Sequence, residues 1–435
     1  MRFAKTAIAC AAALSVGTSA YAADMTWKFD EKTSVVSVQG YGIINDATGL
    51  NQYLDRAKVI DVQKGVTRVD KNVFVDCGGV EEIILPDGFT DIGDNSFSLS
   101  GSLKKITLPD TLKTIGSEAF MGCSALADIT LPKSLGSIGR NAFAECDSIK
   151  EFKIDDENPN FKSIGGVLFT KDGSELVLYP PGADTESYTV PDGVVRIAGG
   201  AFSYCENLNE INLPDSLAEI GDYAFFFAKG LRSVNFGSGL RAVGSYSFYG
   251  AKIGELRIPY GAEKIGECAF KNCDALRLAD VPGTVSEIGE NAFYGTADSL
   301  LLCGFGSAAA NAAAADGRPF TETVRVKING AEQEFDVPPI VENGCTMLPM
   351  RKVFESLGAD VTWDEATQTA TGVKDGVVCT VVIGSDTMYK NGNGIKLDAP
   401  AEITNGRTLV HIRAIADAFG AKVGWDERGL VTVDY

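Results

Sequence analysis

Hydrophobic positions recur along this chain with a nearly constant spacing. The phrase Ile-Gly-x-x-Ala-Phe, or a variant of it, closes a series of segments whose phenylalanines are Phe74, Phe97, Phe120, Phe143, Phe202, Phe225, Phe248, Phe270 and Phe293. These residues step by 23, apart from one gap of 59 and one step of 22. A fixed period of this length is the sequence signature of a solenoid, in which each repeat makes one coil.

A second phrase, Leu-x-x-Ile-x-Leu-Pro, lies at 103–109, 126–132 and 208–214, with looser copies at 80–86 and 253–259. Ile106 and Leu108 alternate with the polar Thr107, which predicts a half-buried strand. Pro109 lacks the N–H that would extend the strand. We expect Gly116 to relax the backbone at the next corner and Phe120 to fill the interior of its coil. Since one coil cannot bury its apolar face alone, neighbouring coils are expected to stack about 4.8 Å apart.

The gap of 59 residues is not a break in this pattern. It contains Asn-Pro-Asn-Phe at 158–161, Gly-Gly-Val-Leu-Phe at 165–169 and Lys-Asp-Gly at 171–173. These phrases indicate a widened coil with a hairpin at Asp172 and Gly173, and we expect Phe169 to take the interior position. The sequence therefore predicts a β-rich leucine-rich-repeat solenoid of about ten coils, each of about 23 residues.

Together these phrases resemble the BspA-like (Treponema pallidum-type) leucine-rich repeat, over about residues 61–320. Residues 23–60 resemble the N-terminal strand cap of that family, mainly through 27–44. The alanine-rich run 308–315 resembles its C-terminal capping helix, which suits the high helix propensity of alanine; a linker is the alternative. The resemblance implies a surface-exposed bacterial protein, because several family members are adhesins that bind host or partner proteins.

A different pattern begins near residue 324 and contains its own duplication. Residues 346–351 match 408–413, and residues 361–365 match 423–427, both with an offset of 62. Each half predicts an amphipathic helix that ends at Gly358 or Gly420, followed by a strand that carries Trp363 or Trp425. We therefore expect a small α+β C-terminal domain with internal duplication at 324–435.

This second region resembles the copper amine oxidase N-terminal-like domain, which lies apart from the catalytic core and also occurs as a stand-alone module in bacterial surface proteins. The oxidase itself needs several histidine ligands and a tyrosine in an Asn-Tyr context. The chain has one histidine, His411, and no Asn-Tyr pair. One imidazole cannot build a multi-histidine copper site, so we expect no enzyme. His411 stands where the first half has Pro349, which favours a structural role for it. Arg351 and Arg413 are expected to anchor their helices, with ligand binding as the alternative.

Residues 1–22 have the pattern of a signal peptide. Arg2 and Lys5 precede a short apolar core, and Ala20-Tyr21-Ala22 offers a cleavage site. Cleavage removes two cations and so lowers the formal net charge from −19 to −21. This charge argues against a nucleic-acid partner and against adsorption to anionic lipid. No later segment has about 18 uninterrupted apolar residues, so we expect a secreted or cell-surface protein with no transmembrane segment after cleavage.

The chain contains no nucleophile elbow, P-loop or His-Glu-x-x-His motif. We therefore predict no catalytic residue, no cofactor and no metal site. A set of cysteines each lies three residues after an interior phenylalanine: Cys77, Cys123, Cys146, Cys205 and Cys273. We favour a buried ladder of small free thiols, and a disulfide between Cys123 and Cys146 is the alternative.

One group of aromatic residues is a candidate partner-binding site: Tyr204, Tyr223, Phe226, Phe227, Tyr246 and Tyr249. Tyr223 and Tyr246 share one repeat position on adjacent coils, and Phe226 and Tyr249 share another. If they are exposed they form a patch of the kind favoured at protein interfaces, whereas ordinary packing between coils is the alternative.

These observations favour a non-catalytic, exported bacterial protein that binds an extracellular or envelope protein through its solenoid, in adhesion or surface interaction. The alternative function is that of a cell-envelope structural or docking protein.

Overall fold

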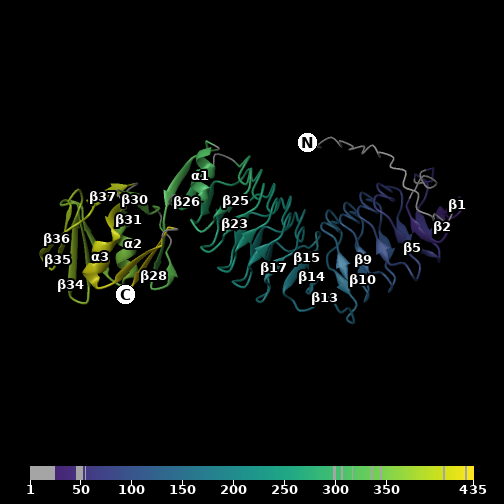
Figure 1. Ribbon diagram of the computed structural model, residues 1–435, viewed down its shortest axis with the longest axis horizontal. Coiled ribbons are helices and arrows are strands. Elements are labelled where there is room, and N and C mark those ends of the chain that lie inside the picture. The colour runs from purple at the N-terminus through teal and green to yellow at the C-terminus, as the bar shows by residue number, and fades with distance from the viewer. Residues whose placement is uncertain are drawn as a thin grey trace.

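The computed structural model describes residues 25–45, 52–53, 55–296, 300–304, 307–315, 317–333, 335, 337–342, 345–404, 407–426 and 429–435. The predicted signal peptide lies outside these residues. The chain forms a long β-solenoid, followed by a small module of strands and two helices (Figure 1). No helix in the described part of the chain is long and apolar enough to cross a membrane.

One edge of each coil contributes a strand to what we call the first ladder, which runs through four consecutive sheets. The strand β1 (Thr26–Asp30) pairs antiparallel with β2 and covers the N-terminal end of this ladder. The ladder strands are β2 (Val35–Gln39), β4 (Val59–Val62), β6 (Glu82–Ile84), β8 (Lys105–Thr107), β10 (Thr130–Leu131), β12 (Lys153–Ile154), β16 (Ser187–Thr189), β18 (Glu210–Asn212), β20 (Ser233–Asn235), β22 (Glu255–Arg257), β24 (Leu278–Val281), β26 (Leu300–Gly304) and β27 (Phe320–Thr323).

A second ladder lies along another edge of the coils, as two sheets. Its strands are β3 (Gly42–Ile44), β5 (Val66–Val69), β7 (Asp91–Ile92), β9 (Thr114–Ile115), β11 (Ser137–Ile138), β13 (Phe161–Ile164), β14 (Val167–Thr170), β15 (Glu175–Leu178), β17 (Arg196–Ile197), β19 (Glu219–Ile220), β21 (Ala242–Val243), β23 (Lys264–Ile265) and β25 (Glu287–Ile288). The pairing is parallel and follows the sequence period, so that Ile83 lies opposite Ile106 and Ile197 opposite Ile220.

The predicted solenoid is confirmed, and it makes about 12 turns. The count exceeds the ten predicted from the phenylalanines because the end segments join the same ladder. At the N-terminal end β2 pairs with β4. At the C-terminal end β26 pairs with β24, and the alanine-rich run forms helix α1 (Ala308–Ala315) rather than a linker.

The phenylalanines that set the period stack inside the solenoid. Phe74, Phe97, Phe120 and Phe143 follow one another at centroid distances of 5.4, 5.4 and 5.2 Å. A second stack runs from Phe202 through Phe225, Phe248 and Phe270 to Phe293 at 4.7 to 5.4 Å. All but Phe293 are fully buried, so each coil buries its largest side chain against its neighbours.

The widened coil separates these two stacks. The hairpin predicted at Asp172 and Gly173 is confirmed, because β14 and β15 pair antiparallel around it. The prediction for Phe169 is wrong in part: Phe169 is buried, but the ring stacked on Phe202 is that of Tyr179, at 4.8 Å. The extra hairpin displaces the chain, so that Tyr179, four residues beyond Glu175, reaches the stacking position.

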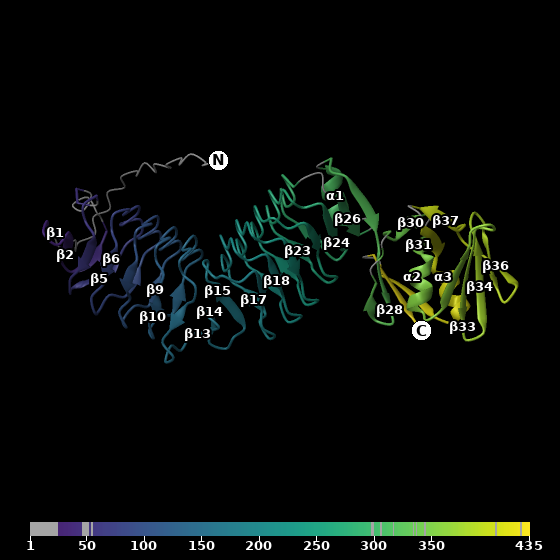
Figure 2. The same ribbon diagram turned by 180° about the vertical axis from the view of Figure 1, so that it is seen from behind.

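The strands β14 and β15 have both faces buried, and successive residues face different cores. Leu168 and Leu178 belong to the core of the N-terminal coils, whereas Phe169 and Leu176 belong to that of the C-terminal coils. The two halves of the solenoid meet at an angle at this coil (Figure 2).

The corner glycines are needed for a reason other than the predicted one. Gly116 does not have a left-handed backbone; instead, a Cβ at Gly116 would lie 2.5 Å from the backbone nitrogen of Asp94 in the preceding coil. At Gly139 the corresponding distance, to the nitrogen of Ser117, is 2.2 Å. A side chain is excluded at these corners because adjacent coils touch there through their backbones.

The predicted thiol ladder is present, since all nine described cysteines are free and buried. The thiol of Cys123 donates to the carbonyl oxygen of Phe97 at 3.2 Å, and that of Cys146 to the carbonyl oxygen of Phe120 at 3.1 Å. Burial raises the pKa of Cys123 to about 12, so the ladder consists of neutral thiols.

The C-terminal module contains three sheets around two helices. Its elements are β28 (Arg325–Ile328), β29 (Ala331–Glu332), β30 (Ile340–Glu342), β31 (Cys345–Pro349), α2 (Met350–Ser356), β32 (Asp360–Asp364), β33 (Thr369–Lys374), β34 (Val377–Val382), β35 (Thr387–Lys390), β36 (Asn393–Lys396), β37 (Glu402–Thr404), β38 (Arg407–His411), α3 (Ile412–Phe419), β39 (Lys422–Asp426) and β40 (Leu430–Asp434). The duplication is visible as two strand–helix–strand units, β31–α2–β32 and β38–α3–β39. Gly358 and Gly420 both have left-handed backbones where their helices end, as predicted.

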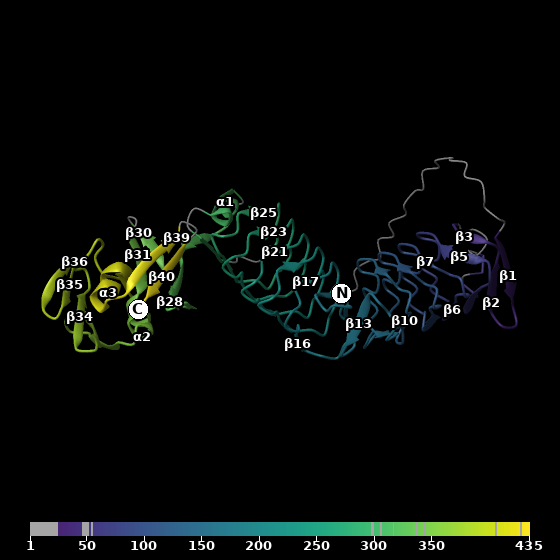
Figure 3. The same cartoon turned by 60° about the horizontal axis from the view of Figure 1, so that its bottom comes forward.

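The module joins the solenoid through continuous backbone pairing. The last strand of the first ladder, β27, pairs with β26, and β28 begins two residues later (Figure 3). Arg325 at the start of β28 is buried, and its guanidinium lies 3.1 Å from Asp280 on β24 and 3.2 Å from Glu332. Arg325 also donates to the carbonyl oxygen of Ile258. The first residues of the module are thus fixed to the final coils.

Candidate functional site

The six predicted aromatic residues form one continuous cluster on the surface of three successive coils; we call it the aromatic patch. All six side chains are partly exposed, which lies between the two predicted alternatives. The patch is built by the turns that follow β17, β19 and β21. In each turn a phenylalanine points inward, and its neighbours point outward. Tyr204, Tyr223, Phe227 and Tyr246 adopt left-handed backbones there, which turns the outward rings to one side.

The rings of the patch pack against one another. Tyr223 and Tyr246 stack at 5.0 Å with an interplanar angle of 5°. Phe226 lies 5.3 Å from Tyr249 and 4.7 Å from Phe227. Tyr204 completes the cluster, 5.7 Å from Phe227. Such packing holds the rings in place, so a partner that binds them would lose little conformational entropy on the protein side.

Hydrogen bonds fix the tyrosine hydroxyls at one edge of the patch. The hydroxyl of Tyr246 donates to Glu267 at 2.9 Å, and the amide of Asn272 donates to the hydroxyl of Tyr249 at 2.8 Å. The hydrogen bond to Glu267, followed by that to Cys268, raises the pKa of Tyr246. These tyrosines therefore present neutral ring faces to solvent.

Charged residues of the coils before the widened coil border the other edge. The guanidinium of Arg140 lies 4.3 Å from the ring centre of Tyr223, at cation–π distance. Burial and the carboxylates of Glu145 and Glu118 raise the pKa of Tyr204 to about 12. This juxtaposition of coils about 60 residues apart in sequence was not predictable, because it depends on the course of the widened coil.

Carboxylates gather at this same border. Burial, followed by the charge of Asp147, raises the pKa of Glu145, and Glu206 raises it further. Burial and the charge of Glu206 also raise the pKa of Asp147. Among these groups, Lys229 forms an ion pair with Glu206 at 3.4 Å. The border nearest Tyr204 is thus predominantly negative, and the crowded carboxylates would gain from a cation brought by a partner.

The exposed face of the first ladder is a weaker candidate. Its charged residues pair with one another across coils, as Lys58 and Lys104 do with Glu81 at 2.9 and 2.8 Å. The hydrogen bonds to Lys104 and Lys58 lower the pKa of Glu81 to about 2. A partner at this face would have to replace pairs that already exist.

A second concave feature lies in the C-terminal module. A cleft of about 520 Å³ is lined by the exposed side chains of Arg351, Lys352, Trp363 and Arg407, with Glu355 at its edge. The expected anchoring of α2 by Arg351 is not found, since Arg351 forms no hydrogen bond or ion pair with a described residue. The sequence analysis did not bring these cations together, because α2, β32 and β38 supply them from distant positions.

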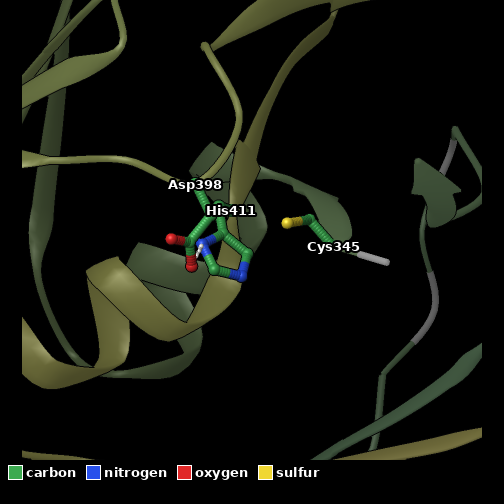
Figure 4. Close-up of side chains that lie close together, drawn as sticks. All are labelled: Cys345, Asp398 and His411. Carbon is green, nitrogen blue, oxygen red and sulfur yellow. Dashed lines mark ion pairs between the residues drawn. The ribbon is translucent and has the colours of Figure 1, made fainter. Parts of the chain in front are cut away.

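The cysteine and histidine set aside in the sequence analysis come together in the same module. Cys345, Asp398 and His411 place one ligand atom each within 4.8 Å of one another (Figure 4). Burial lowers the pKa of His411, while the nearby carboxylate of Asp398 opposes this shift. The only signal in the sequence is that His411 replaces the proline found in the first half.

Comparison with known proteins identifies the repeat. Residues 52–174 and 182–299, together more than half of the chain, match the BspA type leucine rich repeat region. The chain belongs to this family. The BspA type coils carry the aromatic patch, and residues 327–433 separately match the copper amine oxidase N-terminal domain.

Two solved structures resemble this BspA type protein. A leucine rich cell surface protein of Faecalibacterium prausnitzii gives a TM-score of 0.52 at 23% identity, covering 66% of this chain and 95% of that one. The pneumococcal vaccine antigen PcpA gives a TM-score of 0.50 at 28% identity, covering 57% of this chain and 62% of that one. The first likeness concerns the fold alone, because its identity is low.

The curated relative is of a different kind. A primary amine oxidase of Klebsiella aerogenes is 36% identical over 83 residues, which are 19% of this chain and 11% of the oxidase. The chain therefore spans about a tenth of the oxidase.

Proposed function

We propose that this protein is exported to the bacterial surface and binds a partner protein through the aromatic patch. The observation that carries the proposal is a packed cluster of six partly exposed rings on otherwise polar coils. Tyrosine and phenylalanine in such clusters supply much of the binding energy at protein interfaces. The named surface protein of Faecalibacterium prausnitzii supports the proposed location.

The charge around the patch specifies the partner's chemistry. Glu118, Glu145, Asp147 and Glu206 border the rings, and the whole chain carries a formal net charge of −19. Arg140 already occupies one ring face by a cation–π contact. The patch therefore suits a protein segment that carries lysine or arginine beside apolar residues, since its cations can contact both rings and carboxylates.

The proposal includes the absence of catalysis. The match to the amine oxidase covers its N-terminal domain and not the rest of the enzyme, and one histidine cannot replace a multi-histidine copper site. Peroxide production from amines by the purified protein supplied with copper would overturn this part of the proposal.

The binding proposal is tested with the purified full chain, without residues 1–22, against a panel of extracellular-matrix proteins and against envelope from the producing cells. A variant with Tyr223, Phe226, Tyr246 and Tyr249 changed to serine is compared with one in which the exposed Arg232 and Glu255 are changed to serine. We expect saturable binding to a basic partner, weakened at least about 100-fold in the first variant only.

Because the serine variant removes packed rings, a second variant preserves them. Glu145→Lys with Glu206→Lys reverses the charge of the border and should weaken binding of the same basic partner. Wild-type affinity in both variants would exclude the aromatic patch as the binding site.

A second candidate is docking to the cell envelope by the C-terminal module, and the cleft with Arg351, Lys352 and Arg407 favours it. Three cations around Trp363 suit an anionic envelope polymer. In the same panel, changing the three cations to alanine would abolish binding to envelope but leave binding to the protein partner unchanged. The reverse result would exclude this candidate.

A further inference from the structure

The pairing of β31 with β38 brings Cys345 and His411 together. In this antiparallel pair Met347 lies opposite His411. Cys345 is two residues before Met347, so its side chain points to the same face of the sheet. Asp398, in the loop between β36 and β37, reaches the same point from the solvent side. Figure 4 shows the three side chains converging, with the thiol facing the imidazole ring.

The imidazole of His411 has an unmet requirement. Its side chain is 7% exposed, and Nδ1 is buried without a hydrogen-bond partner. Asp398 Oδ2 lies 3.4 Å from Nδ1, close enough for electrostatic attraction but without the geometry of a hydrogen bond. A buried nitrogen lone pair or N–H that is left unpaired costs free energy, so a ligand at this position would satisfy it.

We propose that Cys345, His411 and Asp398 bind a Zn²⁺ ion through one sulfur, one nitrogen and one oxygen atom. Thiolate, imidazole and carboxylate are the three ligand types that Zn²⁺ accepts, at roughly 2.0–2.3 Å. A tetrahedral ion with such bonds separates its ligand atoms by about 3.3–3.8 Å. The distance from Nδ1 to Oδ2 already has this value, and the thiol lies within 4.8 Å of the other two ligand atoms.

The fourth position faces solvent and would be filled by water. Cys345 and His411 are buried, with 8% and 6% of their surface exposed, while the side chain of Asp398 is 67% exposed. The ion would therefore sit at the surface of the sheet, and the exposed carboxylate can adjust to complete the coordination. This site is unrelated to copper amine oxidation, because it contains a single imidazole.

The ion would join parts of the module that are distant in sequence. It links β31 of the first duplicated unit to β38 of the second, and both to the loop after β36. Structural zinc ions contribute directly to folding free energy. The site therefore stabilises the core strands that the two units share.

The experiment is titration of the reduced, metal-free full chain with ZnCl2, followed by calorimetry, together with titration by Co²⁺ followed by absorption. We expect one ion per chain, thiolate-to-Co²⁺ charge transfer, and a Tm that rises with Zn²⁺ and falls with chelator. Cys345→Ser and His411→Asn should abolish the stoichiometric binding and the charge-transfer band.

Asp398→Asn tests the site without disturbing buried residues, and should weaken Zn²⁺ binding at least about tenfold. Asp386→Asn, at another exposed aspartate of the module, and Cys379→Ala, at another buried thiol, should bind as the wild type does. Absence of stoichiometric binding by the wild type overturns the proposal. Unchanged affinity in Asp398→Asn, with the band retained in Cys345→Ser, overturns it equally.

Discussion

Arg325 and Asp280 form a buried ion pair, 3.1 Å between Nη2 and Oδ2, that joins the first strand of the C-terminal module to the solenoid. Asp280 belongs to β24, two strands before the end of the first ladder, so the pair spans β26 and β27. Both side chains are largely shielded from water, at 8% and 16% exposure. Loss of one partner would leave the other buried and unpaired.

Arg325→Ala is therefore expected to destabilise the junction by about 3–5 kcal/mol. The effect should appear as a lower denaturant midpoint and as faster proteolysis near residues 317–333. Arg257→Ala provides the control, because exposed Arg257 lies 3.7 Å from the same carboxylate of Asp280 and should matter by less than about 1 kcal/mol. Equal effects of the two substitutions would contradict the importance of burial.

Gly139→Ala is expected to destabilise the solenoid by about 1–3 kcal/mol, as overpacking does elsewhere. The added Cβ would lie 2.2 Å from the nitrogen of Ser117, and backbone cannot yield as a side chain does. Gly254→Ala adds a Cβ into open space, with its nearest neighbour, the guanidinium of Arg277, 3.9 Å away. Urea denaturation should separate the two variants clearly.

The thiol ladder predicts that reductant does not change stability. With the signal peptide removed, the unfolded protein should titrate with nine free thiols per chain, one for each described cysteine. Thermal unfolding should show the same midpoint with and without dithiothreitol. A lower midpoint in reductant, or fewer thiols, would indicate a disulfide such as the one considered between Cys123 and Cys146.

Glu145→Gln is expected to raise the Tm at pH 7. Because burial and Asp147 raise the pKa of Glu145 in the folded state, the native protein holds this proton more tightly than the unfolded chain does. Stability is therefore lost as pH rises from the unfolded pKa through the higher folded pKa. The glutamine variant escapes this loss, so its advantage should vanish near pH 4.

Glu186→Gln, at an exposed position, is the control for this effect. Its Tm should match that of the wild type at both pH values. A Tm advantage of Glu145→Gln that persists unchanged at pH 4 would show that the effect comes from packing rather than from charge.

The period of the sequence was sufficient to predict the solenoid, its interior phenylalanines and its thiol ladder, because each depends on contacts between equivalent residues 23 positions apart. The exchange of Phe169 for Tyr179 in the stack was not predictable in this way, since the widened coil breaks the period. The need for Gly116 was assigned to backbone freedom, whereas the contact with Asp94 of the preceding coil decides it.

The candidate sites divide along the same line. The aromatic patch was found from shared repeat positions, but its border of Arg140 and Glu145 comes from coils beyond the break. His411 and Cys345 are 66 residues apart in the sequence, and only the pairing of β31 with β38 shows that they meet. Contacts made by irregular connections leave no periodic signal.

The widened coil has a consequence for how damage spreads along the protein. Its strands β14 and β15 send Leu168 into one core and Phe169 into the other, so no single apolar core runs the length of the solenoid. The hairpin acts as a bulkhead. If heat or a protease opens the coils on the N-terminal side, the breach stops at this wall, and the coils that carry Tyr223 and Tyr246 stay intact.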